Sequence, residues 1–386
     1  MEKTRVLYLI SSLTQGGAER HLVDLVRGLD PERWEPAICV LTNRIHYKAE
    51  LPAGQPKYIL RSPVWASPAA VARLITTIRS FRPHILHTYM NDANLWGRLA
   101  VRLASSPSPR VVTSVHLDDM SAGYRWLERP LARWADRIVA HSRSIEEFLV
   151  TRLGVPAQRV TVIPNGVDEQ QFRPPTDDQR RVARRARGLA DDHLVALMPA
   201  RISPQKNHDL VVGALGQLKA AGALPESFRL LLAGRVSSPS YSAQVTAAVR
   251  RHGLEPHVQF LGAVTDMREL YAAADVVLMP SRTEASPIAA LEALSCGLPV
   301  LISAAANTDA VLIPGRHGWQ VDSPTVQTVA DAITDILRST RPQRVEMGTA
   351  SHAYVVERFT CRRVTADFVA LYEDVMRGRV LKQSAL

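Results

Sequence analysis

The densest group of polar residues with catalytic potential follows a short apolar run in the second half of the chain. Glu284 and Glu292 are separated by seven residues, and Ser286 and Pro287 lie between them. Serine is a favourable helix N-cap and proline suits the first helical position, so we expect a helix from there to Gly297. The N-terminus of that helix would attract phosphate. Glu284 would then lie near a reacting group and Glu292 further along a bound nucleotide. The alternative is that Glu284 is an ordinary surface carboxylate and Glu292 an ordinary carboxylate on a helix face. An otherwise apolar helix has little other use for Glu292.

A pair of cations forms a second chemical signal. Arg201 and Lys206 follow the apolar run 195–199 on one short loop. An arginine offers a planar fork and a lysine a point charge, so together they can bind the two phosphates of a diphosphate. Taken alone, the two residues are better explained as solvated side chains on a surface loop.

Two adjacent glycines, Gly16 and Gly17, follow the first apolar run at residues 6–10. Glycine lets the backbone approach a ligand closely, and the helix that follows directs free N–H groups at the same place. The spacing is not G-x-G-x-x-G, so it does not indicate NAD binding. The alternative is a simple tight turn.

These residues must be positioned by the elements that precede them, and short apolar runs alternate with amphipathic stretches along the chain. This alternation predicts a mostly parallel sheet with helices on both faces, and ligands bind beyond the carboxyl ends of such strands. The expected strands are 6–10, 37–41, 84–87, 110–115, 137–140, 195–199, 229–233, 258–260, 276–279 and 298–302. The expected helices are 18–29, 68–81, 95–103, 209–219 and 325–337.

The pattern occurs twice, on either side of a Pro- and Arg-rich stretch near residues 172–190. We therefore expect an α/β protein with two Rossmann-like domains, at residues 1–170 and 171–360. A length of 386 residues suits two such domains. The arginines between 180 and 187 are interpreted as the solvated face of a helix at the domain junction.

Composition excludes several classes of protein. Apolar residues make up 46% of the chain and charged residues 22%, as in a globular protein. No apolar run reaches the roughly 18 residues of a membrane span, and residues 6–10 are too short for a signal peptide. The three cysteines have no zinc-site spacing, and an odd number argues against a disulfide framework, so a reducing cytoplasm is expected. The net charge of +10 suits anionic partners, but no nucleic-acid-binding motif accompanies it.

One basic stretch bears on membrane contact. Residues 124–134 carry Arg125, Arg129 and Arg133 at four-residue steps, with an apolar face alongside them. Such a helix can rest on a membrane surface, which would place the protein at the inner face of the membrane. Pro130 interrupts the stretch, however, and a half-buried helix with solvated arginines is the preferred interpretation.

Taken together, these segments resemble the signature of the retaining glycosyltransferases of family 4, across nearly the whole chain. Each match is modest, but their order and number are specific. The matching segments are 15–20 (glycine loop), 135–142 (strand to serine), 162–168 (interdomain turn), 200–206 (Arg/Lys loop), 260–275 and the Glu-x7-Glu segment at 281–300. The resemblance implies the GT-B fold, with two parallel sheets facing across a cleft. It also implies that the last helix, within 361–386, joins the N-terminal domain.

The resemblance assigns roles to individual residues. The N-terminal domain would bind the acceptor and the C-terminal domain a nucleoside-diphosphate sugar, with UDP as the favoured nucleotide. No cofactor is expected, and no metal, since Arg201 and Lys206 would neutralise the leaving diphosphate. The donor-binding set is Gly16, Gly17, Arg201, Lys206, Glu284, Ala285, Ser286, Pro287 and Glu292, and the catalytic set is His116, Glu284, Arg201 and Lys206.

Three histidine and asparagine positions complete this assignment. His116 follows the strand 110–115 and matches a histidine that relatives place by the donor sugar. His87 and Asn91 would line the acceptor side, with a hydrogen-bonded histidine at a strand end as the alternative for His87. The acceptor itself, whether a glycan, a lipid-linked sugar or a small molecule, is left open.

The chain departs from the family pattern at two places. Glu284 is followed by alanine, where the family often has glycine, and residues 303–309 lack the usual pair of glycines near the donor sugar. The identity of the sugar therefore stays open. Two rival functions remain: a nucleotide-sugar epimerase on the same fold, and a partner subunit without catalytic activity. Release of nucleoside diphosphate from a panel of donors separates all three.

Overall fold

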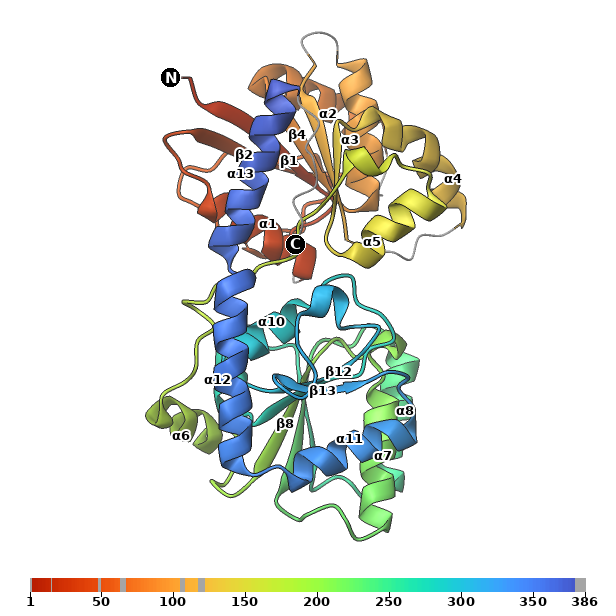
Figure 1. Ribbon diagram of the computed structural model, residues 1–386. Coiled ribbons are helices and arrows are strands. Elements are labelled where there is room, and N and C mark those ends of the chain that lie inside the picture. The colour runs from red at the N-terminus through yellow and green to blue at the C-terminus, as the bar shows by residue number, and fades with distance from the viewer. Residues whose placement is uncertain are drawn as a thin grey trace. The chain divides into compact units, whose positions relative to one another are not determined.

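The structure, a computed structural model, describes residues 2–14, 16–47, 50–62, 67–104, 108–116 and 122–378. The chain divides into two compact units. Unit 1 comprises Met1–Gly166 and Cys361–Leu386, and unit 2 comprises Val167–Thr360. Each unit is built around one parallel sheet accompanied by helices (Figure 1). The expected α/β class with two Rossmann-like domains is confirmed.

Unit 1 contains a seven-stranded sheet in the order β3-β2-β1-β4-β5-β6-β7, and every neighbouring pair is parallel. The strand order reverses direction between β1 and β4, which is the point where open parallel sheets bind ligands. The strands are β1 (Thr4–Ile10), β2 (Trp34–Val40), β3 (Lys57–Ile59), β4 (Ile85–Tyr89), β5 (Arg110–Val115), β6 (Arg137–Ala140) and β7 (Val160–Val162).

The helices of unit 1 include one from the far end of the chain. α13 packs beside α1, where a Cβ on Gly28 would lie 2.5 Å from the Thr365 hydroxyl oxygen (Figure 1). Phe368 and Tyr372 of α13 are buried in the core of this unit. The helices are α1 (Gly17–Gly28), α2 (Pro68–Phe81), α3 (Asn91–Leu103), α4 (Ala122–Leu131), α5 (Arg143–Glu147) and α13 (Cys361–Arg377).

Unit 2 contains a six-stranded parallel sheet in the order β10-β9-β8-β11-β12-β13. Its strands are apolar on both faces because helices cover both. Along β8, Val195 and Leu197 enter one buried cluster, and Ala196 and Met198 enter another. The strands are β8 (Leu194–Pro199), β9 (Phe228–Ala233), β10 (Val258–Gly262), β11 (Val276–Met279), β12 (Val300–Ser303) and β13 (Gly318–Val321).

In unit 2, α6 precedes the first strand, β8, and α12 is the last helix. The other helices each follow a strand. The helices of this unit are α6 (Asp177–Arg185), α7 (His208–Ala220), α8 (Pro239–Arg251), α9 (Arg268–Ala273), α10 (Ile288–Ser295), α11 (Val326–Arg338) and α12 (Arg341–Arg358).

Candidate active site

Two loops of unit 2 that follow neighbouring strands are joined by hydrogen bonds. The Gln205 side chain donates to the Thr283 carbonyl over 3.0 Å, and the Arg282 amide donates to the Gln205 carbonyl over 2.8 Å. Because β8 and β11 pair in parallel, their carboxyl ends meet at the same edge of the sheet. The Arg201–Lys206 loop and the Glu284 loop, which are far apart in the sequence, therefore form one surface.

Asn207 anchors this junction with an unusual backbone conformation. Its φ is 58°, in the left-handed region that asparagine tolerates better than most residues. Its side-chain amide donates to the Pro280 carbonyl over 2.7 Å and accepts from Arg282 Nε over 2.9 Å. Sequence reasoning missed Asn207, because neither its role in joining the loops nor its φ leaves a motif.

Lys206 and Glu284 form an ion pair at the centre of the joined loops, through Lys206 Nζ and Glu284 Oε1. Their side chains are only 14% and 10% exposed, so water screens the pair weakly. Arg201 lies on the same loop and is exposed to solvent. The structure thus places one cation and one carboxylate in contact, and a second cation, Arg201, on the same loop as Lys206.

The helix after Glu284 begins later than the sequence indicated. α10 starts at Ile288 with Pro287 as its N-cap residue, and no side chain caps it. The prediction that Ser286 caps the helix and Pro287 opens it is wrong. The backbone of Pro287, at φ −82° and ψ 80°, has not yet entered the helix. Within this first turn the Ile288 and Ala290 amides already donate to the Ser286 and Pro287 carbonyls over 3.0 and 2.9 Å, so the helix dipole rather than free amides would attract an anion there.

Glu292 lies within α10 and is half-buried. The Tyr271 hydroxyl of α9 donates to Glu292 Oε2 over 2.8 Å, and burial together with this carboxylate raises the pKa of Tyr271 well above its usual range. Tyr271 therefore stays protonated and fixes the orientation of the carboxylate. Sequence reasoning selected Glu292 but missed its tyrosine partner.

Gly234 follows β9 at the same edge of the sheet. A Cβ at this position would lie 2.0 Å from the Ala200 carbonyl oxygen, so only glycine lets β9 end this close to the start of the Arg201 loop. Its amide donates to the Gly262 carbonyl over 2.7 Å. This glycine was also missed, since a single glycine after a strand is a weak signal.

The glycine loop of unit 1 opens α1 as expected. The helix begins at Gly17, and Gly16 is its extended N-cap residue with no side-chain cap. A Cβ on Gly16 would lie 2.3 Å from Glu19 Oε2, so a larger residue would displace that carboxylate. Gln15, the first residue of the predicted loop, lies outside the described residues.

His116 directly follows β5 and is 8% exposed. Its ring stacks on His141 with centroids 3.9 Å apart, and its Nε2 has no hydrogen-bond partner among the residues that the structure describes. Burial, reinforced by His141, lowers the pKa of His116 well below its usual range, so the imidazole is neutral at pH 7. His116 is therefore a buried neutral imidazole whose Nε2 has no partner among the described residues. This nitrogen is suited to hydrogen-bond a ligand.

His87 does not fit the predicted acceptor side. It lies within β4 rather than at its end and is completely buried. Its Nδ1 contacts the Tyr372 hydroxyl at 2.6 Å and its Nε2 the Ser114 hydroxyl at 2.9 Å. Both nitrogens are therefore used inside the unit, which favours the alternative of a hydrogen-bonded histidine, although within the strand rather than at its end. Asn91 is the first residue of α3 and is half-buried.

Comparison with known proteins identifies the family. The model of glycosyl transferases group 1 matches residues 179–353, and the model of glycosyltransferase family 4 matches residues 15–171. The chain belongs to the family 4 glycosyltransferases. The resemblance stated from the sequence is thereby confirmed, and the protein is an enzyme of the hexosyltransferase type.

Individual relatives agree with this assignment. A protein of Stackebrandtia nassauensis named D-inositol 3-phosphate glycosyltransferase is 29% identical over 89% of this chain and 74% of its own length. Its namesake in Geodermatophilus obscurus is 31% identical over 64% of this chain and 54% of its own length. The crystal structure of Anabaena HepE in complex with UDP and glucose has a TM-score of 0.84 at 21% identity, covering 96% of this chain and 99% of that one. A glycosyltransferase from Rickettsia africae gives the same TM-score at 18% identity, over 98% of this chain and 100% of that chain. These two structures establish the fold.

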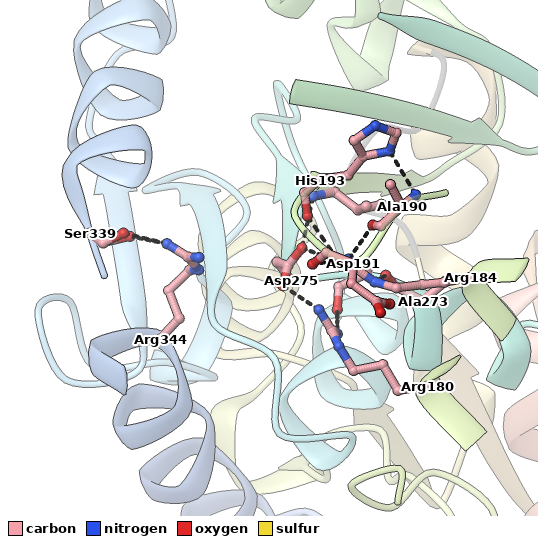
Figure 2. A network of polar contacts seen from close by, with 11 residues as sticks. Arg180, Arg184, Ala190, Asp191, His193, Ala273, Asp275, Ser339 and Arg344 are labelled. Carbon is pink, nitrogen blue, oxygen red and sulfur yellow. Dashed lines mark hydrogen bonds and ion pairs between the residues drawn. The ribbon is translucent and has the colours of Figure 1, made fainter. Parts of the chain in front are cut away.

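Two arginines of this glycosyltransferase that the sequence placed in solvent point inward. Arg180 and Arg184 on α6 each donate to Asp275 over 2.6 Å, and Arg184 is 2% exposed (Figure 2). Asp275 also accepts from the Val195 amide over 2.8 Å. The prediction of a solvated face is therefore wrong for these two arginines. Through Asp275 the two arginines hold the start of β8 in place. The Arg201 loop follows the other end of this strand.

α4 buries one face through an ion pair. Glu128 is 1% exposed and pairs with Arg98 on α3, whose side chain is fully buried. On the same helix Trp126 is 78% exposed and Leu127 43% exposed. The interpretation of residues 124–134 as a half-buried helix is confirmed for the side chains from 126 onward. The side chain of Arg125 lies outside the described residues.

Two further features are absent from the described ranges. No group of three or more metal-ligating side chains occurs there, and no helix there is long and apolar enough to span a membrane.

The buried histidines predict acid sensitivity of unit 1. Burial lowers the pKa of His141 to about 4 and that of His21 well below its usual range. These groups are neutral when folded, whereas in the unfolded chain they titrate near pH 6.5. Below about pH 6.5 the unfolded state binds more protons, so stability is full above that pH and falls toward pH 4, by about 1.4 kcal/mol per pH unit for each histidine.

The measurement is urea unfolding at pH 7 and pH 5, followed by tryptophan fluorescence, since Trp34 is buried in unit 1. His141→Phe removes one titrating group, so the pH dependence of the free energy of unfolding should correspond to one proton fewer. Equal pH dependence in the variant and the parent protein would show that His141 does not contribute.

Proposed function

We propose that this enzyme transfers a sugar from a nucleoside-diphosphate sugar to an acceptor hydroxyl with retention of anomeric configuration. The observation that carries the proposal is the Lys206–Glu284 pair on the two joined loops of unit 2. It brings a cation for the leaving diphosphate and a carboxylate for the sugar within contact distance of each other.

In this proposal unit 2 binds the donor. Arg201 and Lys206 bind the diphosphate, and the N-terminal end of α10, after Ala285 and Ser286, attracts phosphate oxygens through its helix dipole. Glu292, oriented by Tyr271, accepts hydrogen bonds from the ribose hydroxyls. A UDP-sugar is the favoured donor, in keeping with the UDP bound to HepE in its crystal structure.

The chemical step breaks the bond between the anomeric carbon and the phosphate oxygen, whose electron pair leaves with the diphosphate. The acceptor hydroxyl attacks the same face of the sugar, and its proton passes to the departing phosphate oxygen. Arg201 and Lys206 stabilise the negative charge that develops on the diphosphate as it leaves. His116 of unit 1 hydrogen-bonds the donor sugar through Nε2.

The test is a donor panel of UDP-, GDP- and ADP-sugars, with and without inositol 3-phosphate, the acceptor in the name of two relatives. Acceptor-dependent release of nucleoside diphosphate supports the proposal. A new nucleotide sugar without release would indicate the epimerase, and binding without turnover would indicate a partner subunit without catalytic activity.

Turnover is expected to survive chelation. If Arg201 and Lys206 supply the positive charge that the leaving diphosphate needs, no divalent cation is required. We expect initial rates with excess EDTA within about twofold of those without it, since the positively charged side chains remain. Loss of activity in EDTA with recovery in magnesium or manganese would contradict this role of the two residues.

We also propose peripheral contact with an anionic membrane through α4 and the turn after it. Trp126 and Leu127 are exposed there, and Arg129 and Arg133 are exposed nearby, the combination that favours an anionic lipid surface.

Sedimentation with vesicles of phosphatidylcholine and phosphatidylglycerol tests this contact. Changing Trp126 and Leu127 together to serine should weaken binding at least about tenfold. Val345→Ser, at an exposed valine of unit 2, is the control. Binding that neither the double change nor added salt weakens would refute a membrane contact at this site.

A further inference from the structure

His141 follows β6, and its ring is fixed from several sides. It is fully buried, and its Nδ1 lies 2.9 Å from the Ile163 carbonyl oxygen. A carbonyl only accepts hydrogen bonds, so Nδ1 carries the proton and, in the neutral ring, Nε2 does not. The ring of His21, on α1, meets the His141 ring edge-on, with centroids 4.9 Å apart. The ring centroid of Phe368, on α13, lies 6.5 Å from that of His141.

His116 depends on this fixed ring for its own orientation. The His116 and His141 rings are inclined by only 21° at a centroid distance of 3.9 Å. Tyr89 is also stacked with His116, at 5.5 Å and 27°. Within the described part of the chain no hydrogen bond restrains His116 Nε2, so ring stacking sets the direction of that nitrogen.

We propose that His141 is a positioning residue: it holds the His116 imidazole flat against its own ring and so directs His116 Nε2 at the donor sugar. This inference rests on the proposed function, in which His116 contacts the sugar. A rotation that moves Nε2 by about 1 Å can cost on the order of 100-fold in rate without changing how the rest of the donor binds. His141 would therefore affect kcat more than KM.

Two substitutions of similar size separate stacking from simple filling of space. His141→Phe keeps a flat ring, and His141→Leu fills the volume without one. We expect the leucine variant to lose roughly 30- to 100-fold in kcat with little change in the KM for the donor. The phenylalanine variant should recover to within about fivefold of the parent enzyme, since a planar ring can still stack.

His257→Leu is the matched control, because His257 is also buried and its Nδ1 also lies near a backbone carbonyl, that of Phe228, at 3.0 Å. It belongs to unit 2, whereas His116 belongs to unit 1. Its kcat should stay within about twofold of the parent, because it stacks on no catalytic ring. Equal melting temperatures and equal affinity for UDP show that each variant is folded.

A second readout does not depend on turnover. In protein with ¹⁵N-labelled histidine, the His116 ring signals, assigned with His116→Asn, should keep their chemical shifts in His141→Phe and move or broaden in His141→Leu. Full activity of the leucine variant, or equal losses in both variants, overturns the proposal, as do His116 signals that are the same in all three proteins. If no donor is turned over by the parent enzyme, the proposed function fails, while the ring signals still decide whether His141 orients His116.

Discussion

Glu284→Gln is expected to lower turnover at saturating donor about 100-fold, as does removal of one transition-state stabiliser elsewhere. Glutamine has nearly the same shape and can still accept a hydrogen bond from Lys206, so the two joined loops should keep their geometry. What is lost is the negative charge beside the sugar, which matters most as positive charge develops on the ring. The Kd for free UDP should therefore change less than about threefold, since UDP carries no sugar at that position.

Glu292→Gln should behave in the opposite way. Its proposed ribose contacts exist in both donor and product, so their loss should weaken UDP binding in every state, by about 1.5–3 kcal/mol. Calorimetric titration with UDP and steady-state rates, measured for both variants, separate the two roles. Glu269→Gln is the control, since that carboxylate is 64% exposed in the same unit. If Glu284→Gln is the variant that loses UDP affinity, the two carboxylates have been assigned the wrong way round.

Lys206→Gln is expected to lower turnover by about 100- to 1,000-fold and also to weaken UDP binding. The lysine would hold the diphosphate in the ground state and stabilise its growing charge as the sugar leaves. The change also leaves the buried carboxylate of Glu284 without its cation, and an unpaired buried charge is costly. Part of the loss should therefore come from disorder of the joined loops.

The double variant Lys206→Gln with Glu284→Gln separates these contributions. Because the two side chains touch, its loss should be smaller than the sum of the single losses in free energy. Lys219→Gln is the control, because the Lys219 amine donates to the Gly253 carbonyl and lies on another part of unit 2. Normal turnover in Lys206→Gln would show that the lysine serves only to hold the loops together.

The elements that position the site could be predicted from the sequence where local signals are strong. The strands β5, β6 and β11 have the expected bounds, because each is a short apolar run with clear breaks. α2 was also predicted to the residue, since the Ser67 side chain caps it and Pro68 opens it. By contrast, α12 and the edge strand β3 were missed, because α12 has a polar sequence and β3 has only three residues.

Contacts that are distant in the sequence could not be predicted. Lys206 and Glu284 are 78 positions apart, and no local pattern around either residue indicates that the two side chains pair. Arg184 and Asp275 pair across 91 positions, and nothing local tells which arginine of a cluster turns inward. His141 stands out in the sequence only as part of a strand motif, because ring stacking leaves no pattern there.

The central claim, transfer of a sugar with retention, is tested most directly by the ¹H NMR spectrum of the isolated product. With an α-linked UDP-sugar and an acceptor that promotes UDP release, we expect a new glycosidic bond to the acceptor whose anomeric proton has the small coupling constant of an α-gluco or α-galacto linkage. A β-linked product would contradict retention. UDP released together with free sugar only, for every acceptor tried, would contradict transfer itself.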